Sequence, residues 1–232
     1  MRIKDNPSMK SNLIVMLTLN DQTVKNAIDI FEECKDLEVD FWGFKNVGIS
    51  EPQMQDLVNR IKKANKQVVL EVVTYSEAGC IDAAKFASDN NIDFLIGTCF
   101  YKEAWNFISK TSMQYFPFVG NVYGSPSVLS GSIDDIINEA IMLREKGVQG
   151  VDLLAYRYLG NPIELAQKLN SHVDTKIILA GSVNSYTRLK EVNNIDPWAF
   201  TIGGALFNGS FAQGKGFRTN LIKVIELMNS LK

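Results

Sequence analysis

The sequence alternates short apolar runs with amphipathic segments, and this cycle occurs eight times along the chain. An uninterrupted apolar run is typical of a parallel strand buried on both faces, because such a strand has no side that faces solvent. The eight predicted strands are Leu13–Leu19, Val39–Phe44, Val68–Val73, Phe94–Ile96, Tyr115–Val119, Val151–Leu154, Ile177–Ala180 and Ala199–Ile202.

The amphipathic segments between these runs predict helices, and several begin at good helix-capping residues. Ser50 precedes Pro52, and proline is well tolerated in the first turn of a helix. The same reasoning places helix starts at Ser76, Ser132, Asn161 and Ser185. Asp21 is predicted to cap a first helix that runs to about Lys35, and a last helix is expected from about Phe217 to Leu231.

Strands separated by helices imply right-handed crossovers and a parallel sheet. Eight such units favour closure, since an open doubly wound sheet usually has five or six strands. The 232 residues approach the roughly 250 that are typical of a one-domain barrel, and no linker divides them. We therefore predict an α/β protein, a single-domain (β/α)₈ TIM barrel over residues 1–232, with 1–11 as an N-terminal extension.

Composition excludes several classes of protein. The net charge is −2 and the basic residues are scattered, so we expect no nucleic-acid partner and no basic membrane-binding surface. No apolar run approaches the roughly 18 residues of a membrane span, and the first residues lack the apolar core of a signal peptide. With only three widely spaced cysteines, the chain is predicted to be cytoplasmic with reduced thiols. A homodimer is the default expectation for its assembly.

Charged residues within the predicted strands are the candidates for catalysis. Glu71 lies inside VVLEVVT, where an outward carboxylate would enter the apolar layer beneath the helices at high cost. We expect it to point into the barrel, together with Asp152 in GVDLLAY and Lys45 after FWGF. Neighbouring strands would let Lys45 pair with Glu71. Either carboxylate could transfer protons with Lys45 as its electrostatic partner, or all three could form a structural polar network.

Other polar residues fall at predicted strand ends, where barrel active sites are built. Asn20, Thr98, Asn121 and Arg157 are candidates for contact with substrate, although Arg157 could instead form a salt bridge on a helix surface. Cys99 is interpreted as a structural thiol, because no histidine lies near it in sequence. The single histidine, His172, falls on the opposite face of the barrel, and the sequence requires no metal or cofactor.

The connection Gly120–Gly131 is rich in turn-forming residues and longer than the two to six residues usual for such loops. Because it follows the fifth strand on the active-site face, we interpret it as a mobile loop that covers the substrate. An irregular connection is the alternative.

Two strand ends carry glycines and feed directly into helices, at Gly181-Ser182 and at Gly203-Gly204. Free backbone N–H groups there can converge on an anion, and glycine allows the close approach. These are the last two units of the repeat, where (β/α)₈ barrels frequently bind phosphate. We predict that Gly181, Ser182, Gly203 and Gly204 bind a phosphate group; tight turns without a ligand are the alternative.

The segments LAGSVNSYTRLKEV and AFTIGGALFNGSF resemble the closing half-barrel of the ribulose-phosphate-binding barrels, and the phosphoribosyl isomerases of histidine biosynthesis most of all. The resemblance implies a TIM barrel in which these glycine pairs hold a substrate phosphate. Those isomerases carry catalytic aspartates at strands one and five, where this chain has Thr18–Asn20 and Val119–Asn121. Their second phosphate motif is replaced by Val73–Ser76, which argues against a bis-phosphorylated substrate.

The order of elements also resembles that of the keto-deoxy-phosphogluconate aldolases, and FPFVGNVYGSPS is similar to their proline-glycine loop after strand five. Their Schiff-base lysine lies in strand six. This chain has Asp152 there, so Lys45 would have to take that role.

These observations favour an enzyme that binds a small phosphorylated sugar or sugar acid and acts as an isomerase or epimerase, moving a proton next to a carbonyl. Glu71 or Asp152 would be the base and Lys45 would stabilise the enolate oxygen. One alternative is an aldolase, a lyase in which Lys45 forms a Schiff base. Another is a non-catalytic barrel that binds a phosphorylated effector, since fold does not determine function.

Overall fold

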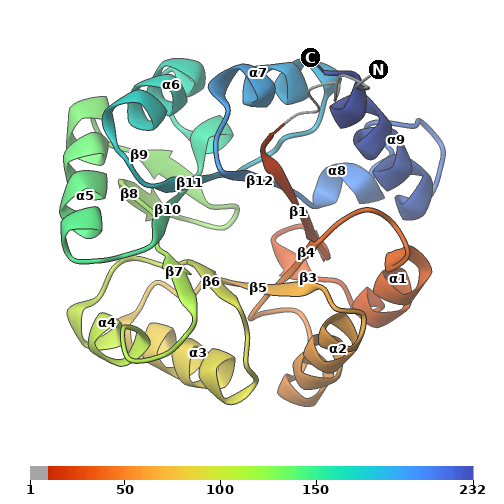
Figure 1. Cartoon of the computed structure of the whole chain (residues 1–232), viewed down its shortest axis with the longest axis horizontal. Helices are drawn as coiled ribbons and strands as arrows, with labels where there is room; N and C mark the ends of the chain where they lie inside the picture. Colours follow the sequence, from red (N-terminus) through yellow and green to blue (C-terminus); the bar gives the residue numbers. More distant parts are fainter. Residues whose placement is uncertain (1–9, 232) are drawn as a thin grey trace, which may run out of the picture.

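The computed structural model describes residues 10–231, and its centre is one parallel sheet that curls into a nearly closed barrel (Figure 1). In sheet order the strands are β10 (Gly150–Leu153), β11 (Lys176–Leu179), β12 (Ala199–Ile202), β1 (Asn12–Met16), β4 (Phe41–Lys45), β5 (Gln67–Val72), β6 (Phe94–Gly97) and β7 (Gln114–Phe116). Beyond β7, Phe118 pairs in parallel with Asp152 of β10 and brings the two sheet edges together. The predicted (β/α)₈ TIM barrel is therefore confirmed.

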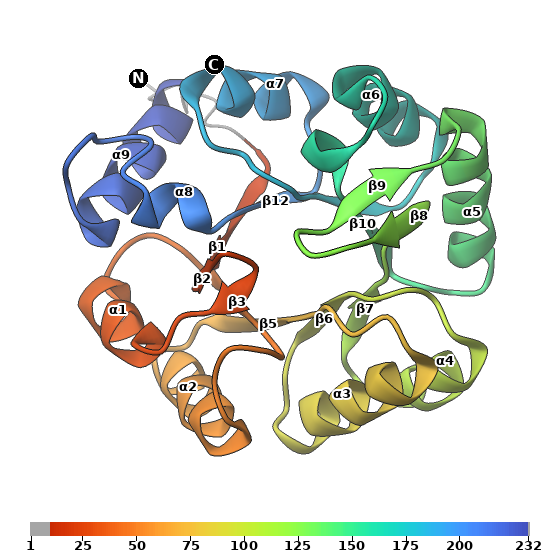
Figure 2. The same ribbon diagram turned by 180° about the vertical axis from the view of Figure 1, so that it is seen from behind.

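Helices surround the sheet on its outer side (Figures 1 and 2). They are α1 (Ala27–Cys34), α2 (Glu51–Lys63), α3 (Glu77–Asp89), α4 (Lys102–Ile108), α5 (Ile133–Glu145), α6 (Pro162–His172), α7 (Tyr186–Ile195), α8 (Gly204–Phe207) and α9 (Phe217–Ser230), with a 3₁₀ turn η1 (Ala155–Arg157) after β10. The predicted helix caps are confirmed at Ser50, Ser76, Ser132, Asn161 and Ser185. Of the predicted extension 1–11, residues 1–9 lie outside the described residues.

The prediction that Asp21 caps the first helix is wrong. Helix α1 begins at Ala27 with Asn26 at its N-cap position, and Asp21 lies six residues earlier in a β-hairpin. The hairpin joins β2 (Thr18–Leu19) to β3 (Gln22–Thr23), and both turn residues, Asn20 and Asp21, have positive φ, 50° and 59°. Asn and Asp tolerate this conformation, which a tight two-residue turn requires. The predicted strand Leu13–Leu19 is accordingly split in two.

The connection Gly120–Gly131 forms a second hairpin rather than an irregular loop. Strands β8 (Asn121–Tyr123) and β9 (Val128–Ser130) pair antiparallel, with Val122 and Leu129 buried at the centre of the pairing. Figure 2 shows this hairpin and the β2–β3 hairpin on the same side of the barrel. Both follow carboxyl ends of barrel strands, so both border the face where barrel active sites are built.

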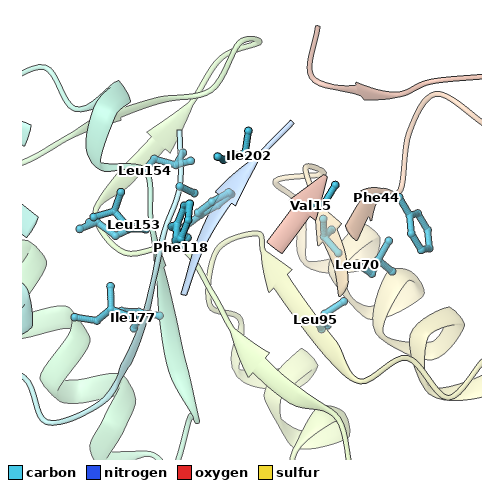
Figure 3. Packing of buried hydrophobic residues seen from close by; sticks show 14 of the residues in the cluster. Val15, Phe44, Leu70, Leu95, Phe118, Leu153, Leu154, Ile177 and Ile202 are labelled. Atoms are coloured by element: carbon cyan, nitrogen blue, oxygen red, sulfur yellow. The ribbon is translucent and has the colours of Figure 1, made fainter. Parts of the chain in front are cut away.

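Two separate apolar layers hold the barrel together, because successive side chains of a strand point to opposite faces. The inner layer fills the barrel with Ile14, Met16, Val69, Phe94, Ile96, Phe116, Ile178 and Ala199, with Phe41 and Trp198 against them. The outer layer lies between strands and helices; Val15, Phe44, Leu70, Leu95, Leu153 and Ile177 belong to it (Figure 3). Lys45 and Glu71 share the inward parity of Phe41 and Val69, which places both charges inside the barrel.

Gly150 packs tightly against the inner apolar layer, and its substitution tests this packing. A Cβ atom there would overlap the Phe116 ring and lie 2.5 Å from the carbonyl oxygen of Lys176. Gly150→Ala is expected to lower the free energy of unfolding by about 1–3 kcal/mol through overpacking, as measured by urea denaturation. The control Gly216→Ala, with no atom within 4 Å of its new methyl group, should cost less. Equal losses in the two variants would contradict the packing described here.

Candidate active site

A cavity of about 460 Å³ opens at the carboxyl ends of the barrel strands, a volume within the range of small-molecule sites. Residues at or just beyond the ends of β1, β4, β5, β10, β11 and β12 line it, and the β8–β9 hairpin adds Ser125 and Pro126. Eight of the residues selected from the sequence are in its wall: Asn20, Lys45, Glu71, Arg157, Gly181, Ser182, Gly203 and Gly204.

Four charged side chains form a connected network on the cavity wall. Lys45 Nζ lies 3.0 Å from Asp21 Oδ1 and 3.3 Å from Glu71 Oε1, so the predicted Lys45–Glu71 contact is present. Arg157 binds both carboxylate oxygens of Asp21, with Nη1 at 2.9 Å from Oδ2 and Nη2 at 3.0 Å from Oδ1. Asp21 therefore bridges the two cations, and the alternative surface salt bridge for Arg157 is not what the structure contains.

The network is well shielded from water: Lys45 is 4% exposed and Glu71 is 9% exposed. Burial alone would lower the pKa of Lys45, but the charges of Glu71 and Asp21 outweigh it and raise the pKa above its ordinary value. Burial would likewise raise the pKa of Asp21, yet its hydrogen bonds and ion pairs with Arg157 and Lys45 hold that pKa well below the ordinary range. At neutral pH Lys45 is an ammonium group and Asp21 a carboxylate.

Asp152 lies inside the barrel, outside the cavity wall. Its side chain is fully buried, and neither carboxylate oxygen has a hydrogen-bond partner within the described part of the chain. Burial, reinforced by the negative charge of Glu71, raises the pKa of Asp152 well above its ordinary value. The buried site therefore favours the uncharged form of this carboxyl group. Of the two carboxylates expected to act as a base, only Glu71 faces the cavity.

The two glycine-containing strand ends also line the cavity. Gly181 and Ser182 both have positive φ, 87° and 69°, and Gly203 packs so closely that a Cβ would lie 2.7 Å from Thr18 Oγ1. Among the described residues, the backbone N–H groups of Ser182, Gly203 and Gly204 donate to no protein acceptor. Unpaired donors beside a cavity are available to a ligand.

Two further candidates lie elsewhere. Thr98 is fully buried, has a φ of 61° and donates its hydroxyl to the Thr74 carbonyl at 3.3 Å. Asn121 lies in β8, where its amide donates to Ser130 Oγ at 3.2 Å. Neither residue lines the cavity. His172 ends α6 on the opposite, exposed side, and Cys99 is half-buried outside the cavity wall.

Sequence reasoning missed three contributors to this site. Asp21 was assigned to a helix cap, although the Asn-Asp pair directly after a strand is also a signal for a tight turn. Thr201 lines the cavity from β12; its inward parity with Ala199 could have identified it. Ser127 donates its backbone N–H to Asp21 Oδ2 at 3.3 Å and lies 2.6 Å from the Tyr75 hydroxyl. No local pattern in the sequence indicates this long-range contact.

No protein-family model and no curated protein sequence matches this chain. Solved structures, in contrast, do superimpose on it. Orotidine 5'-phosphate decarboxylase from Pyrococcus horikoshii OT3 superimposes with a TM-score of 0.67 at 11% identity, covering 93% of this chain and 98% of its own. N-acetylmannosamine-6-phosphate 2-epimerase from Clostridium perfringens gives 0.63 at 12% identity, with 97% and 98% covered.

A regulatory protein is also similar in structure. The glycerol uptake operon antiterminator regulatory protein from Listeria monocytogenes superimposes with a TM-score of 0.57 at 16% identity, covering 88% of this chain and 96% of its own. At such identities the likeness establishes the barrel fold alone, because one fold carries many functions. The fold expected from the resemblance to phosphate-binding barrels is thereby confirmed.

No helix among residues 10–231 combines the length and apolar character needed to cross a bilayer. Within the same range, no group of three or more His, Cys, Asp or Glu side chains is arranged to hold a metal ion.

Asp152→Asn is expected to change how stability depends on pH. Burial and the charge of Glu71 raise the pKa of Asp152 in the folded chain, whereas the unfolded chain begins to lose this proton at about pH 4, so ionisation favours unfolding as the pH rises. The free energy of unfolding of the variant, relative to wild type, should therefore increase from about pH 4 to pH 7 in urea titrations. Asp174→Asn, at an exposed position, serves as the control. A difference that stays constant over this range would mean that Asp152 is ionised in the folded chain.

Proposed function

We propose that this chain is an enzyme that binds a small phosphorylated sugar or sugar acid and transfers a proton next to its carbonyl group, as in isomerisation or epimerisation. One observation carries the proposal. A single cavity combines unpaired backbone donors of two strand ends with a buried lysine–glutamate ion pair. The first feature suits a phosphate group and the second suits proton transfer with charge stabilisation.

In this proposal the phosphate is held by the N–H groups of Ser182, Gly203 and Gly204. Phosphate oxygens accept several hydrogen bonds, and glycine lets the backbone approach them closely. The printed names of two structural neighbours, a decarboxylase and an epimerase, both include a phosphorylated compound. Those names support a phosphorylated substrate for this chain as well.

Two carboxylates in the cavity wall contact Lys45, and Glu71 acts as the base because Arg157 occupies both oxygens of the other one, Asp21. It takes a proton from the carbon next to the carbonyl, and the electron pair of the C–H bond moves to the carbonyl oxygen. The Lys45 ammonium donates a hydrogen bond to that oxygen and stabilises its negative charge. Return of the proton to the former carbonyl carbon, with the hydroxyl proton of the adjacent carbon passing to the former carbonyl oxygen, gives isomerisation. Return of a proton to the other face of the original carbon re-forms the carbonyl group and gives epimerisation.

The electrostatics of Lys45 oppose the aldolase alternative. A Schiff-base lysine must attack as a free amine, which a lowered pKa makes available near neutral pH. Here Glu71 and Asp21 raise the pKa of Lys45 and keep it charged. Borohydride treatment in the presence of substrate is accordingly expected to leave Lys45 without a covalent adduct.

Glu71→Gln is expected to lower kcat by a factor of about 10²–10⁴, because the amide cannot accept the proton. The measurement is incorporation of solvent deuterium next to the carbonyl of aldose and ketose phosphates, followed by NMR. Glu103→Gln, the same change on the exposed side of α4, is the control and should retain activity. Full activity in Glu71→Gln, or a borohydride adduct on Lys45, would contradict the assignment. If Glu71→Gln bound ligand as before but wild type showed no exchange, a non-catalytic binding barrel would be favoured.

Gly203→Ala is expected to weaken binding of inorganic phosphate about tenfold, the equivalent of losing one hydrogen bond to a charged group. Its new methyl group would collide with Thr18 Oγ1 and displace the backbone donors. Gly204→Ala adds the same methyl group 3.7 Å from Leu19, where there is room, and should bind phosphate nearly as wild type does. Titration calorimetry measures both. Equal affinities in the two variants would place the phosphate elsewhere.

A further inference from the structure

The charges around the cavity balance. Among the described residues in its wall, the charged side chains are Asp21, Lys45, Glu71 and Arg157, two carboxylates and two cations. Their formal charges sum to zero. Asp152 lies behind them inside the barrel and is not part of the cavity wall.

Both cations are also paired with protein anions. Lys45 contacts two carboxylates, at 3.0 Å and 3.3 Å. Arg157 binds both oxygens of Asp21 and also donates to the Ser127 carbonyl at 3.3 Å. The Arg157 side chain packs against Gly181, where an added Cβ would lie 3.1 Å from Arg157 Cγ. Gly181 therefore restricts the position of the Arg157 side chain on that side. Neither cation is left without an anionic partner.

The remaining polar groups of the wall are uncharged. They include the side chains of Thr18, Asn20, Ser182, Asn184, Thr201 and Asn208. Hydroxyl and amide groups both donate and accept hydrogen bonds, so they match the hydroxyl groups of a sugar chain.

We infer that the substrate carries its phosphate as its only ionised group, on an otherwise uncharged polyhydroxy carbonyl chain. This inference rests on the proposed function and narrows its substrate class from sugars and sugar acids to sugars. A carboxylate or second phosphate beside Lys45 would face Asp21 and Glu71 with no free cation to offset the repulsion. Opening the Arg157–Asp21 pair to receive it would deprive Asp21 of one of its two cationic partners, which is costly in a poorly hydrated site.

A matched pair of unreactive ligands tests the inference: a pentitol monophosphate and the pentonate monophosphate of the same chain. They differ in one terminal group, hydroxymethyl or carboxylate, and neither offers a ketone or aldehyde for proton transfer. Titration calorimetry on the full chain measures binding alone. We expect wild type to bind the pentonate compound at least about tenfold more weakly than the pentitol compound. Equal or tighter binding of the pentonate compound would overturn the inference.

Charge variants identify the cause of the preference. Asp21→Asn and Glu71→Gln each leave one excess positive charge at the cavity, so in both the preference should shrink or reverse. The control is Asp36→Asn, which removes the same charge from an exposed ion pair with Arg218 and should leave the preference unchanged. A preference that survives both cavity substitutions, or that Asp36→Asn alters equally, would contradict the inference.

The outcomes separate this inference from the proposed function. If neither ligand nor inorganic phosphate binds, the phosphate site fails and the inference fails with it. If both ligands bind with equal affinity, only the inference fails. If the expected preference appears but no aldose or ketose phosphate exchanges a proton, the catalytic proposal fails and the ligand class stands.

Discussion

The Asp21 carboxylate is the interaction on which the mouth of this barrel depends. It accepts hydrogen bonds from Lys45 of strand β4, from Arg157 after β10 and from Ser127 of the β8–β9 hairpin. Three segments far apart in sequence thus converge on one side chain that a two-residue turn holds in place. Without this anion, two cations would lie close together in a poorly hydrated space, at a large electrostatic cost.

The barrel itself could be predicted because its determinants are local and repeated. Continuous apolar runs identify strands that are buried on both faces, and capping residues such as Ser132 and Asn161 mark helix starts within a residue or two. The inward direction of Lys45 and Glu71 followed from strand parity and from the cost of a charge in the outer apolar layer. These arguments need only neighbouring residues and the two-residue alternation of side chains along a strand.

The site was less predictable because its parts are joined over long distances. Asp21 fits a helix cap or a turn equally well by sequence, and only its contact with Arg157, 136 residues later, shows what the carboxylate does. Asp152 followed the same parity argument as Glu71, yet it lies deeper in the barrel and away from the cavity. Parity gives the direction of a side chain, but its depth depends on how the strands are staggered.

The β8–β9 hairpin links access to the cavity with the arrangement of the charges at its mouth. Its Ser127 donates to Asp21 and accepts from Arg157, and it also meets the Tyr75 hydroxyl. The hairpin cannot lift away from the mouth without giving up hydrogen bonds that orient these charges. Opening the mouth and setting the electric field inside it are therefore thermodynamically linked. A substitution at Tyr75, outside the main cavity, would change both how readily a solute enters and how the site discriminates among solutes.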